Sequence, residues 1–69
     1  MTEQQRIFEV GKRVLTITRN RVILATWLHE LTDQTASGID CTNDWKALHD
    51  LWREAVQAKR ELHMLAQAA

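Results

Sequence analysis

Apolar residues recur at steps of three and four along the first half of this 69-residue chain, which is the spacing of one face of an α-helix. This face consists of Ile7, Val10, Val14, Ile17, Arg21, Leu24, Leu28 and Leu31, so that a single arginine interrupts the row. A second row follows Gly38 and runs through Leu48, Leu51, Ala55, Ala58, Leu62, Leu65 and Ala69. The pattern predicts two long amphipathic helices that form an all-α, antiparallel hairpin.

Local signals mark the ends of both helices. Thr2 can cap the first helix, and Gly38 suits the left-handed conformation that closes a helix. Thr42 or Asn43 can begin the second helix, with Asp40 as a competing cap. We therefore predict a single domain over residues 1–69, with helices at about 3–36 and 43–67 and a loop at 37–42.

A hairpin of this length cannot enclose a core, because each helix covers only one side of the other. Ordering the chain costs about 1.5 kcal/mol per residue, or about 100 kcal/mol in all, and the area buried in one hairpin cannot offset that cost. Further apolar residues beside the main rows, such as Leu15 and Trp52, widen the apolar arc of both helices. We expect two hairpins to dimerise into a four-helix bundle.

The charges cancel over the whole chain but are distributed unevenly along it. Residues 6–21 contain five basic residues and one acidic residue, whereas residues 22–50 contain one basic residue and five acidic ones. In a hairpin these stretches lie toward opposite ends, which favours antiparallel pairing of two copies. The longest apolar runs are too short to span a membrane or to form a signal peptide, so we expect a cytoplasmic protein.

The sequence lacks the motifs of common catalytic and metal sites. It has no glycine-rich phosphate loop, no paired cysteines and no HExxH motif, and the single Cys41 cannot form an internal disulfide. His49 and His63 are about 21 Å apart along one helix, too far to share a metal ion, although His29 and His49 can meet across the turn. We predict a protein without enzymatic activity, metal or cofactor.

Arg21 occupies a position in the first apolar row where a leucine would be expected. A buried guanidinium needs an acidic partner, and Glu54, Glu61 or an acid of another protein can supply one, in which case Arg21 would fix the register of the helices. Alternatively, the stem of Arg21 lies along the core and its charged head reaches water. Both interpretations remain open from the sequence.

Two further pairs of apolar residues indicate contact with another protein. Ile23 and Trp27 are predicted to project from the side of the first helix opposite the main row, and this composition is typical of a binding anchor or of a homodimer interface. Ile7 and Phe8 fall where the first helix should extend past the end of the second. We predict a protein-binding module that acts as an inhibitor, adaptor or co-chaperone. Its predicted contact residues are Ile7, Phe8, Arg21, Ile23 and Trp27.

The alternative function is nucleic-acid binding. Arg6, Lys12, Arg13 and Arg19 are predicted to share the outer face of the first helix over about four turns, where they can contact phosphates. A homodimeric helical hairpin of this size resembles in outline the plasmid copy-number proteins of the Rop type. That resemblance implies that the first helix of each copy grips paired RNA loops.

The second helix has a different resemblance. The run Asp44-Trp45-Lys46-Ala47-Leu48, with the apolar row that follows it, is similar in pattern to the second helix of the small helical-hairpin co-chaperones of type III secretion. This similarity implies that the chain holds an aggregation-prone partner protein. Small phage-encoded inhibitors of host regulators share the same plan, which favours a partner protein in that setting as well.

Overall fold

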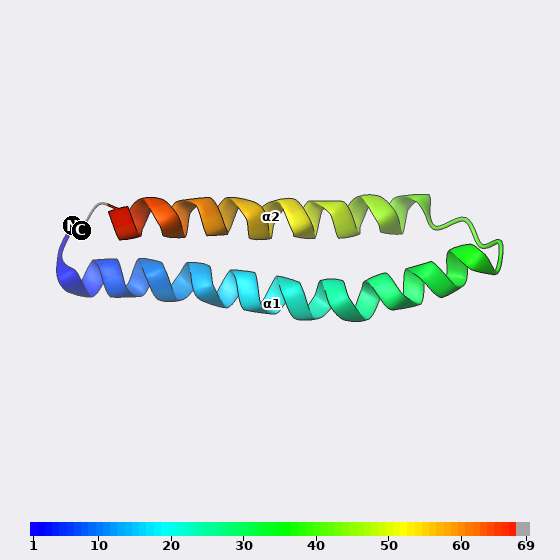
Figure 1. Cartoon of the computed structure of the whole chain (residues 1–69), viewed down its shortest axis with the longest axis horizontal. Coiled ribbons are helices and arrows are strands. Elements are labelled where there is room, and N and C mark those ends of the chain that lie inside the picture. Colours follow the sequence, from blue (N-terminus) through cyan, green and yellow to red (C-terminus); the bar gives the residue numbers. More distant parts are fainter. Residues whose placement is uncertain (68–69) are drawn as a thin grey trace.

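The computed structural model describes residues 1–67 as two α-helices that are joined by a short loop. Helix α1 spans Glu3–Ala36 and helix α2 spans Thr42–Gln67. The helices lie side by side and run in opposite directions, so that α1 begins and α2 ends at the same end of a rod 52 Å long (Figure 1). The predicted all-α hairpin is confirmed, and the bounds agree to within one residue. Its dimerisation stays a prediction, and Ala69 lies outside the described residues.

The capping residues of both helices explain where the helices begin and end. Thr2 and Gln5 form a capping box, in which each side chain accepts a hydrogen bond from the backbone N–H of the other. Gly38 has a φ of 86°, as predicted for the residue that closes α1. At the start of α2 the competing cap prevails, because Asp40 Oδ1 accepts from the backbone N–H of Thr42 at 3.1 Å. The same oxygen accepts from the Thr42 hydroxyl.

The apolar core lies at the loop end of the hairpin. Leu31, Cys41 and Leu48 are buried there, and Trp27 and Trp45 pack against them. The loop itself therefore contributes to the core through Cys41, which the sequence pattern did not indicate. Because small domains gain most of their stability from such clusters, this end holds the two helices together.

The face of α1 that packs on α2 differs from the predicted face in every second position. Val10, Ile17, Leu24 and Leu31 lie on the packed face as predicted, but Ile7, Val14, Arg21 and Leu28 are exposed. Their places are taken by the residues one position earlier in the chain, which are Arg6, Arg13, Asn20 and Trp27. The prediction favoured apolar residues, whereas two polar side chains of this row, Arg13 and Asn20, have partners on α2 that make their burial tolerable.

The packed face of α2 is confirmed along the described part of the predicted row. Leu48, Ala55 and Ala58 are buried, and the three leucines that complete the row are partly buried. The small alanines leave space for the larger side chains of α1 at the middle of the rod. Within residues 1–67, neither helix has an apolar stretch of the length that crossing a bilayer requires.

Candidate functional site

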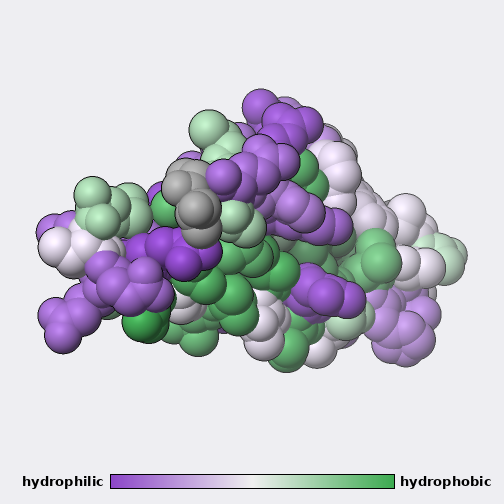
Figure 2. All heavy atoms as spheres, turned by 60° about the vertical axis from the view of Figure 1, so that its left-hand side comes forward, coloured by the Kyte–Doolittle hydropathy of each residue, from purple (hydrophilic) through white to green (hydrophobic). Residues whose placement is uncertain are grey.

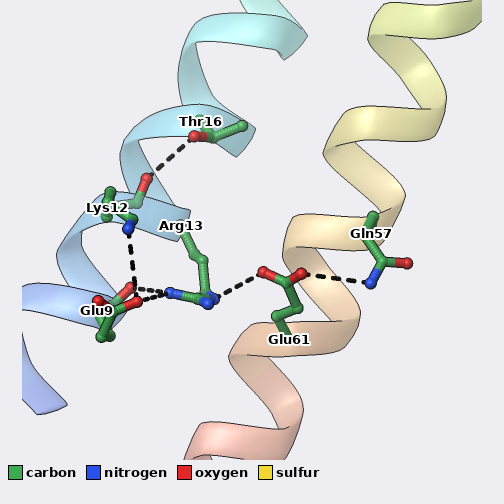
Figure 3. A network of polar contacts seen from close by, with 6 residues as sticks. All are labelled: Glu9, Lys12, Arg13, Thr16, Gln57 and Glu61. Atoms are coloured by element: carbon green, nitrogen blue, oxygen red, sulfur yellow. Dashed lines mark hydrogen bonds and ion pairs between the residues drawn. The ribbon is translucent and has the colours of Figure 1, made fainter.

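One side of the hairpin carries a cluster of ionic contacts between α1 and α2 (Figure 3). Arg13 Nε of α1 lies 2.9 Å from Glu61 Oε2 of α2, and Arg13 also donates a hydrogen bond to the carboxylate of Glu9 one turn earlier. Lys12 Nζ lies 3.6 Å from the same Glu9 carboxylate. On α2, Gln57 donates to Glu61 at 3.3 Å. The cluster therefore joins the two helices by charge near the end where α1 begins.

Two members of this ionic cluster, Glu9 and Arg13, have pKa values that are shifted toward their charged forms. The hydrogen bond from Arg13 is the largest effect on Glu9 and holds its pKa below the ordinary value. Desolvation, the second largest, raises the pKa, and the positive charges of Lys12 and Arg13 lower it further. The hydrogen bond to Glu9 likewise raises the pKa of Arg13. A general acid or base needs a pKa near the operating pH. These shifts move Glu9 and Arg13 away from that range, so the cluster suits a structural role.

The four basic residues predicted to contact nucleic acid are each paired with a glutamate in the described structure. The pairs are Arg6 with Glu3, Lys12 with Glu9, Arg13 with Glu9 and Glu61, and Arg19 with Glu54. The prediction that Arg13 lies on the outer face is wrong, because its side chain lies between the helices. A phosphate group would have to compete with a carboxylate at every one of these positions.

The opposite side of the hairpin carries an open apolar groove between the helices. One part, of about 400 Å³, is lined by Leu24, Ala25, Leu28, Trp45, Leu48, His49 and Trp52. A second part, of about 520 Å³, shares Leu24 and Trp52 with the first and continues along α2 as far as His63. The Trp52 side chain is 53% exposed. Both interhelical ion pairs of the described residues, Arg13–Glu61 and Arg19–Glu54, lie on the other side.

A third surface is an apolar row on the outside of α1, which we call the outer row. It consists of Phe8, Leu15 and Val22, whose exposed fractions are 65%, 67% and 62%. Residues seven apart lie on one line of a helix, and this line points away from α2. Lys12 Nζ lies 5.7 Å from the centre of the Phe8 ring. A view toward the end where α1 begins shows hydrophobic side chains gathered between hydrophilic ones (Figure 2).

The predicted contact residues occupy different surfaces. Phe8 belongs to the outer row, and Ile7 is exposed beside it. Ile23 is exposed at a shallow hollow of about 320 Å³, which Trp27 also lines. The prediction that Trp27 projects away from α2 is wrong, because it packs against the buried cluster at the loop end. Sequence reasoning did not select Leu15 as a contact residue, although its spacing of seven from Phe8 is a signal that was present.

The overhang of α1 is shorter than predicted. Arg13 pairs with Glu61, and Gln67 follows six residues later along α2, so the end of α2 is level with Ile7. Only the first turn of α1 extends past α2. The exposure of Ile7 and Phe8 therefore results from the direction in which their side chains point, and a longer α2 would leave them uncovered.

Asn20 holds the polar position between the helices that the sequence assigned to Arg21. Asn20 is fully buried, and its Nδ2 donates to the backbone carbonyl of Leu51 on α2 at 3.0 Å. Arg21 is exposed at the edge of the apolar groove. The expected acidic partners of Arg21 are engaged elsewhere, since Glu54 pairs with Arg19 and Glu61 with Arg13. The placement fits the alternative in which the charged head of Arg21 reaches water.

The comparisons with known proteins yield no relative for this chain. No family model matches it, and no curated protein sequence and no solved structure matches it either.

Proposed function

We propose that this chain is a non-enzymatic protein-binding module of the cytoplasm, a small inhibitor, adaptor or co-chaperone. Two copies pair into a four-helix bundle, and each copy presents the outer row of α1 to another protein. The observation that carries the proposal is the exposure of Phe8, Leu15 and Val22 on one line of the helix. Large apolar side chains in a contiguous exposed row are typical of interaction surfaces.

The chemistry of the outer row suits recognition of a helix in a groove. Its members recur every two turns over about 21 Å of α1, so they can enter successive pockets of one apolar groove. Burying each of them stabilises a complex by about 1.5–3 kcal/mol before the costs of association. Lys12 over the Phe8 ring adds a charge at the rim of the same surface.

The ionic side of the hairpin has a structural role in this proposal. Its titratable groups Glu9 and Arg13 have pKa values shifted toward the charged form, which is the pattern of a structural ion pair. Among residues 1–67, no three potential metal-ligating side chains come together. We assign the function to the exposed apolar residues of the outer row, which suit contact with another protein.

Affinity capture from the native host tests the outer row directly. The immobilised chain is compared with Leu15→Gln, which places a polar group in the outer row, and with Arg53→Gln, which places the same group on the exposed surface of α2. The original chain and Arg53→Gln should capture the same proteins. Leu15→Gln should bind them with an affinity lower by at least about tenfold, because burial of one leucine side chain stabilises a complex by that factor or more. Mass spectrometry then identifies them.

Two results would refute the assignment. Equal capture by the Leu15→Gln and Arg53→Gln chains would show that the outer row is not the contact surface. Capture of RNA or DNA that weakens steeply between low and high salt would favour the alternative function at Arg6, Lys12, Arg13 and Arg19. An apolar interface should respond little to salt, whereas each phosphate contact adds to the salt dependence.

A further inference from the structure

We propose that the apolar groove beside Trp52 is the surface through which two copies of this chain pair, with their loops at opposite ends. The inference rests on the pairing that the proposed function includes, and it specifies the face, the direction and the register. The groove runs along both helices on the side away from the interhelical ion pairs. The outer row of α1 stays free for another protein.

The lining of the groove indicates that it is covered in the functional state. Leu24 and Leu28 of α1 face Trp45 and Trp52 of α2 across it, and these side chains are too large and too apolar for a surface that stays wet. The exposed apolar residues Ile7 and Val14 continue the line of Leu28 toward the start of α1, and Arg21, which is exposed at the edge of the groove, completes this line at intervals of seven. The groove and this line together form one elongated face that is apolar except at Arg21, His49, Lys59 and His63.

The charge distribution selects the second copy as the occupant and sets its direction. Residues 22–50, at the loop end, contain one basic and five acidic residues, a net charge of −4. Residues 1–21 and 51–67 contain eight basic and four acidic residues, a net charge of +4. When loops lie at opposite ends, each negative half lies on a positive half, whereas loops at the same end would oppose like charges.

The size of the face is adequate for a stable dimer. The hairpin measures 52 Å by 14 Å by its Cα atoms, so one side has an area of about 730 Å². A standard protein interface buries about 800 Å² on each partner. Pairing over the full length of the groove side therefore reaches the ordinary size of a specific complex.

The small residues of α1 fit the close approach of a second copy. Gly11, Thr18 and Ala25 recur at intervals of seven, and Ala25 lines the groove. Within residues 1–67, a Cβ atom added at Gly11 would have no neighbour within 4 Å apart from the adjacent residues and backbone of its own helix, so the packing of α2 does not require glycine there. A helix from another copy that crosses this stripe would make use of that space.

The geometry of such a pair predicts which residues meet. A twofold axis that joins groove to groove with loops at opposite ends places α1 antiparallel to α1 of the second copy. An axis near the middle of α1, between Val14 and Arg21, brings position 7 of one copy opposite position 28 of the other. Residues Ile7 and Leu28 therefore report the direction of pairing.

The first test measures the mass of the chain in solution by sedimentation. The expected mass is about twice the 8.0 kDa of one chain at micromolar concentration. Trp52→Glu and Val14→Glu, on different helices, should each raise the dimer dissociation constant by at least about 30-fold, as loss of an interface anchor does. The control Leu15→Glu in the outer row should leave the dimer intact. A helical monomer of the original chain, or equal effects of all three variants, would overturn the proposal.

A second test does not depend on the folding of those variants. Ile7→Cys and Leu28→Cys are prepared separately, each with the buried Cys41 replaced by alanine, and are treated with a short bismaleimide. When the two variants are mixed, crosslinked dimers should contain mainly one Ile7→Cys chain and one Leu28→Cys chain. Each variant by itself should give fewer crosslinked dimers. Crosslinks that form in each separate sample but not between the two would overturn the antiparallel direction. Unchanged partner capture by Leu15→Gln, with the dimer intact, would instead refute only the role of the outer row.

Discussion

The two ends of the hairpin hold their helices together by different means. At the loop end, Leu31 and Leu48 are buried with Cys41, and two tryptophans pack against them. At the end where α1 begins, the contact between the helices includes the ion pair of Arg13 and Glu61. Burial of apolar surface is the larger stabilising term, whereas ion pairs that reach water are weakened by screening. The loop end should therefore be the more stable half of the rod.

This difference also locates the need for other molecules. The exposed residues Ile7, Phe8 and Leu15 all lie in the half of α1 that is held by charge. Association of another protein with the outer row would bury apolar surface there and stabilise this half, whereas pairing of two copies through the groove would also cover Leu28 and Trp52 nearer the loop. Because association changes the apparent stability, the two ends are compared at one fixed protein concentration.

The largest effect is expected from Leu31→Ala at the loop end. Leu31 is 1% exposed, so its truncation leaves a cavity in the buried cluster that it forms with Cys41 of the loop and Leu48 of α2. The expected loss is about 2–5 kcal/mol of the free energy of unfolding. Urea unfolding followed by circular dichroism measures it.

Leu15→Ala provides the matched control on the same helix. Leu15 is largely exposed, so its truncation should change the free energy of unfolding by less than about 0.5 kcal/mol. Similar losses for Leu15→Ala and Leu31→Ala would contradict the contrast between a packed loop end and an open outer row.

Asn20→Ala should have the second largest effect, at the boundary between the two ends. Its side chain is fully buried and donates to the Leu51 carbonyl, which would lose this partner. An unsatisfied buried polar group costs about 1–3 kcal/mol. Thermal unfolding measures the loss, and Asn20→Leu is the control that fills the same space without the hydrogen bond. Full stability of Asn20→Ala would mean that the hydrogen bond does not hold the helices in register.

The sequence was sufficient to predict the hairpin because its strongest signals are local. The capping of α1 by Thr2, the left-handed Gly38 and the apolar row of α2 depend on near neighbours or on simple periodicity, and each is confirmed. The start of α2 was less certain, since Asp40 and Thr42 are both good caps and only the three-dimensional arrangement of the loop selects Asp40.

The packed face of α1 was harder to predict because the helix is apolar on several sides. Hydrophobicity alone favours the row that contains Val14 and Leu28 over the row that contains Arg13 and Asn20. In the structure, however, Arg13 and Asn20 pack against α2. The reason lies on α2, where Glu61 and the Leu51 carbonyl are placed to receive them. A choice that depends on partners 31 or more residues away is invisible to periodicity, and the position of Trp27 follows from the same choice.

A smaller effect is expected from breaking the ion pair between the helices. In a double-mutant cycle with Arg13→Met and Glu61→Gln, the two changes should be non-additive, because each removes the same contact of 2.9 Å. The coupling should fall when salt is raised to about 1 M, where screening acts over about 3 Å. Urea unfolding of the four proteins at two salt concentrations gives both values. A coupling that is independent of salt would show that this end is not held by charge.

The smallest expected effect is a decrease in the free energy of unfolding at low pH. This decrease has a different physical cause at each end of the hairpin. The pKa of Glu9 is lowered from its ordinary 4.5, first by the hydrogen bond from Arg13, and that of Asp40 is lowered from 3.8, first by the hydrogen bond from Thr42. A carboxyl whose pKa is lower in the folded state stabilises the protein above its unfolded pKa, and this contribution is lost as the pH falls through the folded pKa. Unfolding should therefore become easier below about pH 4.5.

Two variants show how much each end of the hairpin contributes to the loss of stability at low pH. Glu9→Gln should remove the part that depends on salt, because the partners of Glu9 are the charges of Arg13 and Lys12. Asp40→Asn should remove a part that salt barely changes, because Asp40 accepts from the backbone and the hydroxyl of Thr42, which carry no charge. Carboxyl titration by NMR gives the two pKa values directly. If salt raised both pKa values equally, the loop end would also depend on ion pairing, and the distinction between the two ends would fail.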